Sequence, residues 1–172
     1  DLSLMPKEMK ILENGNLFVE GAVSWKDASD FLKPQELNIK TAPTEELALI
    51  TAGAATSATG ERCFHFGNLR SQLKKIYYLN SNGEEKQLDS TKKMKILSST
   101  HEKYNQDFKQ YKDFKNAPFP RFEFETDLLI GTEGQLGVIT AVELEVTKNN
   151  PVNHLFMLVP KWETDPDAQF EI

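Results

Sequence analysis

Apolar and polar positions along this chain of 172 residues predict two β-hairpins, each with runs of strand-like residues on either side of an Asn-Gly step. In the first, over residues 9–22, two apolar-rich runs flank Glu13-Asn14-Gly15-Asn16. Asn-Gly supplies the positive φ angles that a tight hairpin turn requires. Residues 73–88 repeat the pattern around Asn80-Ser81-Asn82-Gly83 and therefore predict a second hairpin.

Helical spacing of apolar residues predicts a short helix over residues 24–32. Ser24 is a favourable N-cap residue, and Pro34 ends the apolar pattern. The apolar positions at helical spacing are Trp25, Ala28, Phe31 and Leu32.

A second helix is predicted to start at Thr44. Glu45 and Glu46 follow this cap residue, and acidic side chains favour the first turn of a helix. Between Ala48 and Gly60 nearly every residue is small. Because such a helix has little side-chain volume, either a flat ligand or a tightly packed neighbouring helix could lie close against it.

The segment 92–116 is polar and Lys-rich, and it predicts a mobile helical insertion that is half exposed at the surface. Its aromatic residues stand near helical spacing, at Tyr104, Phe108, Tyr111 and Phe114. Residues 154–160 are apolar and predict one further strand.

A turn with three glycines, Gly131, Gly134 and Gly137, leads into another predicted strand. In that strand the apolar positions alternate with two glutamates, which predicts one buried and one exposed face. The apolar face carries Val142, Leu144 and Val146, and the other face carries Glu143 and Glu145.

Composition narrows the class of protein. The net charge is −6, so the chain is a poor candidate for binding nucleic acid, which needs clustered Lys and Arg. No apolar run approaches the roughly 20 residues of a bilayer-spanning helix. Cys63 is the only cysteine, which excludes an internal disulfide and agrees with a cytoplasmic protein. The three histidines are far apart, so no metal site is expected.

No catalytic constellation is visible in the sequence. No nucleophile-elbow pattern surrounds a serine, and no pair of carboxylates stands out by its spacing. The three glycines precede a strand rather than a helix and no lysine follows them, so they match neither common phosphate-binding loop. The residues alone therefore predict an α+β domain with a small-residue helix and a glycine turn that could face a flat ligand.

Two ordered motifs carry a resemblance to a known family. Residues 131–140, GTEGQLGVIT, match the pattern G-[ST]-E-G-x-L-G-[VI]-[IV]-T at every position. Upstream, the segment from Pro43 to Arg70 follows the central segment of the same family, with Thr56-Ser57-Ala58-Thr59-Gly60 and Phe66-Gly67 in order. The chain resembles the FAD-linked oxidases with the vanillyl-alcohol-oxidase type of fold.

The resemblance implies a fold class and a domain organisation. Residues 1–148 would form the larger of the two α+β subdomains of the FAD-binding domain, a mostly antiparallel sheet flanked by helices. The subdomain with the pyrophosphate loop would lie outside this sequence. Residues 149–172 would be a linker and the first strand of a substrate domain that carries the catalytic side chains.

The resemblance also implies which residues contact FAD. The flavin and ribityl-pyrophosphate side would lie against the first motif, and the adenosine side against the second, partly through main-chain groups of Val138 and Ile139. The positions carried over are Pro43, Thr44, Leu49, Thr51, Ala52, Thr56, Ser57, Thr59, Gly60, Glu133, Gly134, Gly137, Val138 and Ile139. No catalytic residue and no metal ligand is expected in this part of the protein.

The chain departs from the family pattern at two places. Most relatives have Gly-Gly where this chain has Thr51-Ala52, and many have Asn in place of Ser57. The Thr51 side chain would either add a hydrogen bond to the cofactor or partly block its site.

The function implied for the full-length protein is that of an FAD-dependent dehydrogenase or oxidase. Its substrate would be a small 2-hydroxy acid, such as lactate or glycolate, oxidised by hydride transfer to FAD, and the electron acceptor is not indicated. The part in this sequence would be inactive alone. The alternative is a non-catalytic ligand-binding module of the same fold that has lost FAD.

Overall fold

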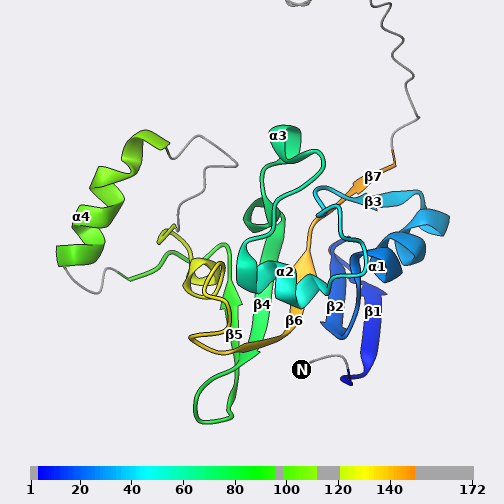
Figure 1. The fold of residues 1–172 in the computed structure, drawn as a ribbon, viewed down its shortest axis with the longest axis horizontal. Coiled ribbons are helices and arrows are strands. Elements are labelled where there is room, and N and C mark those ends of the chain that lie inside the picture. Colours follow the sequence, from blue (N-terminus) through cyan, green and yellow to red (C-terminus); the bar gives the residue numbers. More distant parts are fainter. Residues whose placement is uncertain (1–3, 96–98, 112–120, 150–172) are drawn as a thin grey trace, which may run out of the picture.

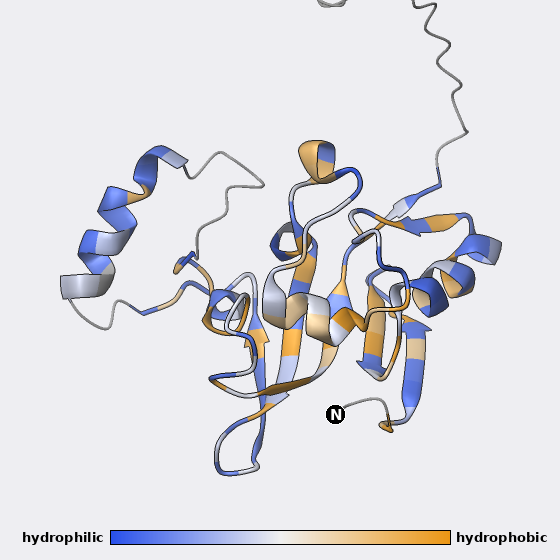
Figure 2. Ribbon diagram, in the orientation of Figure 1, coloured by the Kyte–Doolittle hydropathy of each residue, from blue (hydrophilic) through white to orange (hydrophobic). Residues whose placement is uncertain are grey.

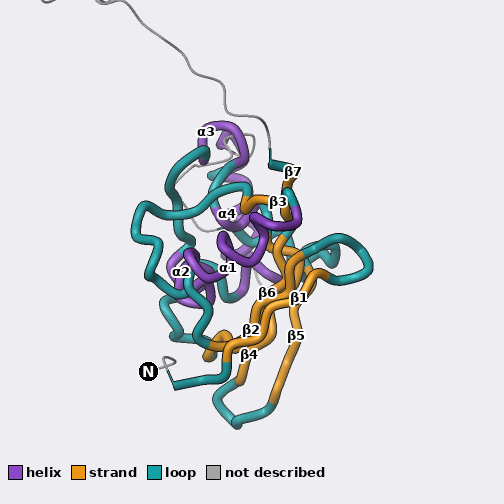
Figure 3. Tube along the Cα trace, turned by 90° about the vertical axis from the view of Figure 1, so that its right-hand side faces the viewer, coloured by secondary structure: helices purple, strands orange, loops and turns teal. Residues whose placement is uncertain are grey.

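The computed structural model describes residues 4–95, 99–111 and 121–149, and their architecture is α+β (Figure 1). A five-stranded antiparallel sheet has the strand order β1-β2-β6-β4-β5. Its strands are β1 (Lys7–Ile11), β2 (Leu17–Gly21), β4 (Leu73–Leu79), β5 (Glu85–Asp89) and β6 (Val138–Leu144). Figure 3 shows helices α1 (Trp25–Leu32) and α2 (Ile50–Thr56) on the same side of this sheet. The predicted fold class is confirmed.

Both predicted hairpins are present. Strands β1 and β2 pair up to Ile11↔Leu17, and β4 and β5 pair up to Leu79↔Glu85, with the Asn-Gly steps in the turns. Strand β6 lies between the two hairpins and pairs with β2 and β4. The last part of the described chain therefore joins two units that could each form locally.

The core lies between the sheet and the two helices. Figure 2 shows hydrophobic residues, in orange, along the central strands β4 and β6. Burying these side chains together with those of the helices is the main stabilising contribution to such a fold. The largest fully buried side chains include Leu17, Trp25, Ile50, Leu69, Ile76 and Leu144.

Helix α1 begins where the sequence predicts. The Ser24 hydroxyl accepts the Asp27 N–H at 3.0 Å, and the Asp27 carboxylate accepts the Ser24 N–H at 2.9 Å, which forms a capping box. Lys7 donates to the same carboxylate at 2.7 Å. The Lys7 ammonium and the Ser24 N–H lower the pKa of Asp27 to about 2. The helix ends at Leu32, and Pro34 lies in the following 3-10 turn.

The predicted start of the second helix is wrong. Helix α2 begins at Ile50 rather than Thr44, and Leu49 provides no side-chain cap. The intervening carbonyl groups have other donors, because Ala48 and Glu46 accept the N–H groups of Trp25 and Lys26 at 3.1 and 2.8 Å. The loop therefore supplies acceptors to the first turn of α1 and cannot use them for a helix of its own.

The predicted C-terminal strand is broken at Glu145. Strand β6 ends at Leu144, and Val146 belongs to β7 (Val146–Lys148), which pairs with β3 (Leu37–Ile39) in a separate two-stranded sheet. Glu143 is 2% exposed, so the face expected to be exposed is covered at this position.

Two short helices complete the described residues. Helix α3 (Cys63–Phe66) has no counterpart in the sequence prediction, whereas α4 (Ser99–Asp107) confirms a helix within the segment 92–116. The predicted strand over residues 154–160 and the proposed linker beyond residue 149 lie outside the described residues.

Candidate functional site

The two motifs of the resemblance meet in space. The turn over residues 131–137, here called the glycine turn, lies against the C-terminal end of α2. The Glu133 N–H donates to the Ala55 carbonyl at 2.9 Å, and a Cβ placed on Gly131 would lie 3.5 Å from Cβ of Ser57. Segments about 75 residues apart in the chain, by their residue numbers, thus form one surface.

This surface, here called the small-residue surface, is defined by five exposed residues from α2, its following loop and the glycine turn. Its members are Ala52, Thr56, Thr59, Glu133 and Gly134. Two apolar side chains border it, because Leu136 is 53% and Val138 45% exposed. The Thr56 hydroxyl is occupied locally, since it donates to the Ala52 carbonyl at 3.1 Å.

The glycine turn also contains main-chain donors without a described acceptor. The turn's own backbone bonds use the N–H groups of Gln135 and Gly137, while that of Glu133 bonds to α2. Among the described residues, none accepts the N–H groups of Gly134 and Leu136. N–H groups of this kind can bind water or a ligand with oxygen or nitrogen acceptors.

The buried side of α2 has small residues for a different reason. A Cβ placed on Gly53 would lie 2.8 Å from Cζ2 of Trp25, so close helix packing requires glycine there. Thr51 is on this side as well, 1% exposed, and no described residue forms a hydrogen bond with its hydroxyl. Its side chain therefore does not stand in the way of a ligand on the small-residue surface.

Pro43, Thr44 and Gly60 gather at the other end of this region. The Glu61 N–H donates to the Ala42 carbonyl at 3.0 Å, and a Cβ on Gly60 would lie 2.6 Å from Cα of Pro43. Pro43 and Thr44 line a hollow of about 650 Å³ together with Trp25, Asn38, Glu61 and Arg62. The structure thus places the first motif's loop beside a cavity, with α2 between it and the glycine turn.

The remaining predicted residues have mainly structural contacts. Leu49 is half buried and forms an isolated bridge with Ser24. The Ile139 side chain is buried in the core, which leaves only its main chain for a ligand. Gly137 has a φ of +156°, and a Cβ there would lie 2.6 Å from Cδ2 of Tyr78. Close packing of the glycine turn on β4 is thus sufficient to require this glycine.

An ion pair that the sequence analysis did not single out involves a carboxylate that lies just before the glycine turn in the chain. Arg70 donates to Asp127 at 2.5 and 2.9 Å in a bidentate arrangement, and Asp127 is 4% exposed. The same carboxylate accepts the N–H groups of Glu123 and Phe124, both at 2.9 Å. The loop after α2 is thereby tied to the segment that leads into the turn.

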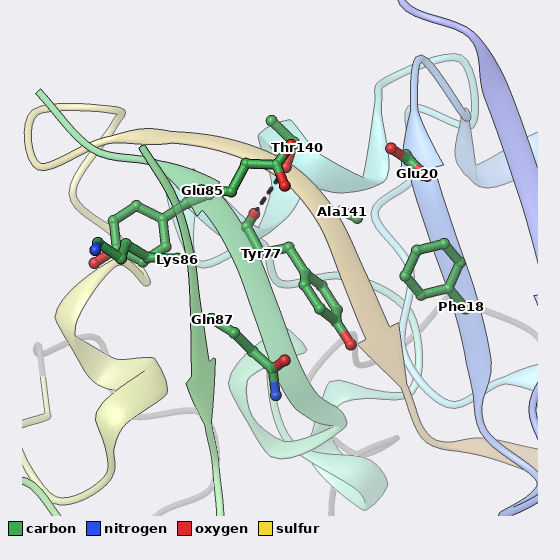
Figure 4. Close-up of a pocket in the computed structure, with 9 residues that line it drawn as sticks. Phe18, Glu20, Tyr77, Glu85, Lys86, Gln87, Thr140 and Ala141 are labelled. Carbon is green, nitrogen blue, oxygen red and sulfur yellow. Dashed lines mark hydrogen bonds between the residues drawn. The ribbon is translucent and has the colours of Figure 1, made fainter. Parts of the chain in front are cut away.

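A second hollow, of about 290 Å³, lies on the face of the sheet away from α1 and α2. Figure 4 shows the rings of Phe18 and Tyr77 on either side of the strand that carries Ala141. The two rings pack edge to face, with their centroids 5.7 Å apart. The Thr140 hydroxyl donates a hydrogen bond to the Tyr77 carbonyl at 3.3 Å. No predicted site residue lies here, because outward strand positions are indistinguishable from solvated ones in the sequence.

Several kinds of site are missing from the part of the chain that the structure describes. No group of three or more His, Cys, Asp or Glu side chains could hold a metal ion there. Over the same residues, no helix combines the length and apolar character needed to cross a bilayer.

In comparisons with known proteins, no family model matches the chain, and no curated protein matches it significantly.

Proposed function

We propose that this chain is the FAD-binding part of a flavin-dependent oxidoreductase. The observation that supports the proposal is the contact between the two motifs of the resemblance, through the Glu133–Ala55 hydrogen bond at 2.9 Å. Chance similarity in two separate motifs gives no reason for them to share a surface. A common ligand gives such a reason.

The chemistry of the small-residue surface suits an extended, flat ligand. Ala52 and Gly134 leave room for close approach, and Leu136 and Val138 offer apolar contact at the border. The N–H groups of Gly134 and Leu136 could bind acceptor atoms of the adenosine part.

In the proposed reaction, bound FAD would accept a hydride from a small 2-hydroxy acid. This part of the protein would hold and orient the cofactor and contribute no acid or base. The proposal includes a cytoplasmic location for the full-length protein.

A second candidate function is a non-catalytic module of the same fold. Packing alone accounts for two of the motif glycines, since a side chain at Gly53 would clash with Trp25 and one at Gly137 with Tyr78. A protein without FAD would keep these glycines to preserve its fold.

A bulky side chain on the small-residue surface tests whether FAD binds there. Ala52 is exposed, so Ala52→Trp in the full-length protein adds volume to this surface without disturbing the core. We expect the variant to lose most of its bound FAD while its thermal midpoint stays near that of the natural protein.

The matched control is Ser81→Trp, at the exposed tip of the β4–β5 hairpin. This variant is expected to keep its flavin. If Ala52→Trp retains FAD at the level of Ser81→Trp, the small-residue surface does not contact the cofactor.

A further inference from the structure

The chain has two Asn-Gly steps, Asn14-Gly15 and Asn82-Gly83, and both lie in exposed hairpin turns. The glycines have similar conformations, with φ of 81° and 74°. Their N–H groups are also engaged alike, by the Leu12 carbonyl at 2.9 Å and the Asn80 carbonyl at 3.0 Å. The glycine nitrogen that follows the asparagine therefore has a similar backbone conformation and hydrogen bond in both turns.

The side chain of Asn14 is held at both ends of its carboxamide. Its Oδ1 accepts the Asn16 N–H at 3.0 Å, which is the local turn closure typical of asparagine. Its Nδ2 donates to Oε1 of Glu143 at 2.7 Å. Any rotation of the Asn14 side chain breaks a bond to a buried carboxylate.

In the second turn a different asparagine has this capping role. Oδ1 of Asn80 accepts the N–H groups of Asn82 and Glu84 at 2.9 and 3.0 Å, and its Nδ2 donates to Glu84 at 3.0 Å. The cap therefore precedes Ser81, and the residue before glycine is Asn82. The Asn82 side chain is exposed and makes no hydrogen bond with any described residue.

We propose that Asn82 is a site of non-enzymatic deamidation and that the fold protects Asn14. In this reaction the Gly83 nitrogen attacks Cγ of Asn82 and forms a succinimide. The bond from Cγ to the side-chain nitrogen breaks, and ammonia leaves with the proton of the Gly83 N–H. Water then opens the ring to give aspartate or isoaspartate, so no oxidant, reductant or enzyme is required.

The consequences of the reaction also differ between the two turns. At Asn82 the new carboxylate enters an exposed turn beside Glu84, whose own carboxylate pairs with Lys86 at 3.0 Å. Isoaspartate lengthens the backbone by one carbon and so strains the Asn80–Glu84 closure, but β5 is an edge strand and the core is not involved. At Asn14 the product would instead face the buried carboxylate of Glu143.

The test compares both sites in the same folded chain. The intact protein is incubated in mildly alkaline buffer, cleaved after lysine and analysed by mass spectrometry. Lys26 ends the peptide with Asn14 and Lys86 the peptide with Asn82, so the sites are measured separately. We expect Asn82 to convert on the order of tenfold faster, because only Asn14 must break a hydrogen bond to a charged group.

The same incubation in concentrated urea is the control, and there the two rates should become similar. The inference is overturned if Asn14 converts as fast as Asn82 in the folded protein. It is also overturned if the difference persists in urea, since the local sequence and not the fold would then cause it. Neither result depends on flavin binding.

Discussion

Loss of one side-chain amide in the first hairpin turn should destabilise the fold, because this amide binds the buried carboxylate of Glu143. Asn16 donates to Oε1 of Glu143 at 2.6 Å, Asn14 donates to the same oxygen, and Lys75 lies 3.5 Å from Oε2. In Asn16→Ala, one hydrogen bond to a charged, 2% exposed group is lost and no other side-chain bond changes.

The expected magnitude follows from that single bond. A hydrogen bond to a charged group contributes about 1.5–3 kcal/mol to the free energy of unfolding. For a domain of this size, a loss near 2 kcal/mol lowers the thermal midpoint by roughly 4–8 °C. Urea denaturation followed by circular dichroism measures the same loss independently.

The matched control is Asn82→Ala, an exposed asparagine in the other hairpin turn without a side-chain bond to any described residue. It should change the free energy of unfolding by less than about 0.5 kcal/mol. A double-mutant cycle with Glu143→Gln adds a second check, because the two substitutions should couple. If Asn16→Ala changes the free energy of unfolding as little as Asn82→Ala does, the hydrogen bond from Asn16 to Glu143 does not stabilise the fold and the prediction is refuted.

Three further predictions concern the fold around the candidate site. Gly137→Val should lower the free energy of unfolding by roughly 1–3 kcal/mol, because its φ is +156° and β4 fills the space of a side chain; an unchanged urea midpoint would contradict this. Arg70→Met should cost about 3–5 kcal/mol, since it leaves the buried Asp127 without its cation, whereas Arg70→Met with Asp127→Asn should recover part of the loss. Stability should fall in acid, because the folded state lowers the pKa of Glu143 below its usual 4.5 and that of Asp27 from 3.8 to about 2. These contributions are complete above pH 4.5 and are lost as both groups are protonated, so a flat stability between pH 4.5 and pH 2 would disprove them.

Local signals explain what the sequence predicted well. The hairpins were predicted from Asn-Gly turns and the runs of residues beside them, and the start of α1 depends on Ser24 and the nearby Asp27. These features need no distant partner, so the pattern alone identifies them.

Contacts with residues far along the chain explain the features that the sequence did not predict. Thr44 has the sequence of a helix cap, but the carbonyl groups that follow serve Trp25 and Lys26 of α1. Glu143 has the spacing of an exposed strand residue, but Asn14 and Asn16 from the first hairpin cover it. Neither interaction leaves a signal in the adjacent sequence.

The candidate site was also predicted only in part from the sequence. The motifs identified the segments that come together, but not which side of α2 each residue occupies. The structure separates Ala52, which is exposed, from Thr51 and Gly53, which are buried. It also adds the ion pair between Arg70 and Asp127, which joins the first motif segment to the residues that precede the second.

The most direct test of the proposed function is the flavin content of the full-length protein. The protein is purified in its natural form, incubated with excess FAD and freed of unbound cofactor. It is then denatured, and the released flavin is identified by chromatography and counted per chain. The account predicts one FAD per chain, with visible absorbance of bound oxidised flavin before denaturation. A folded full-length protein that retains no flavin would contradict the proposal and favour the non-catalytic module.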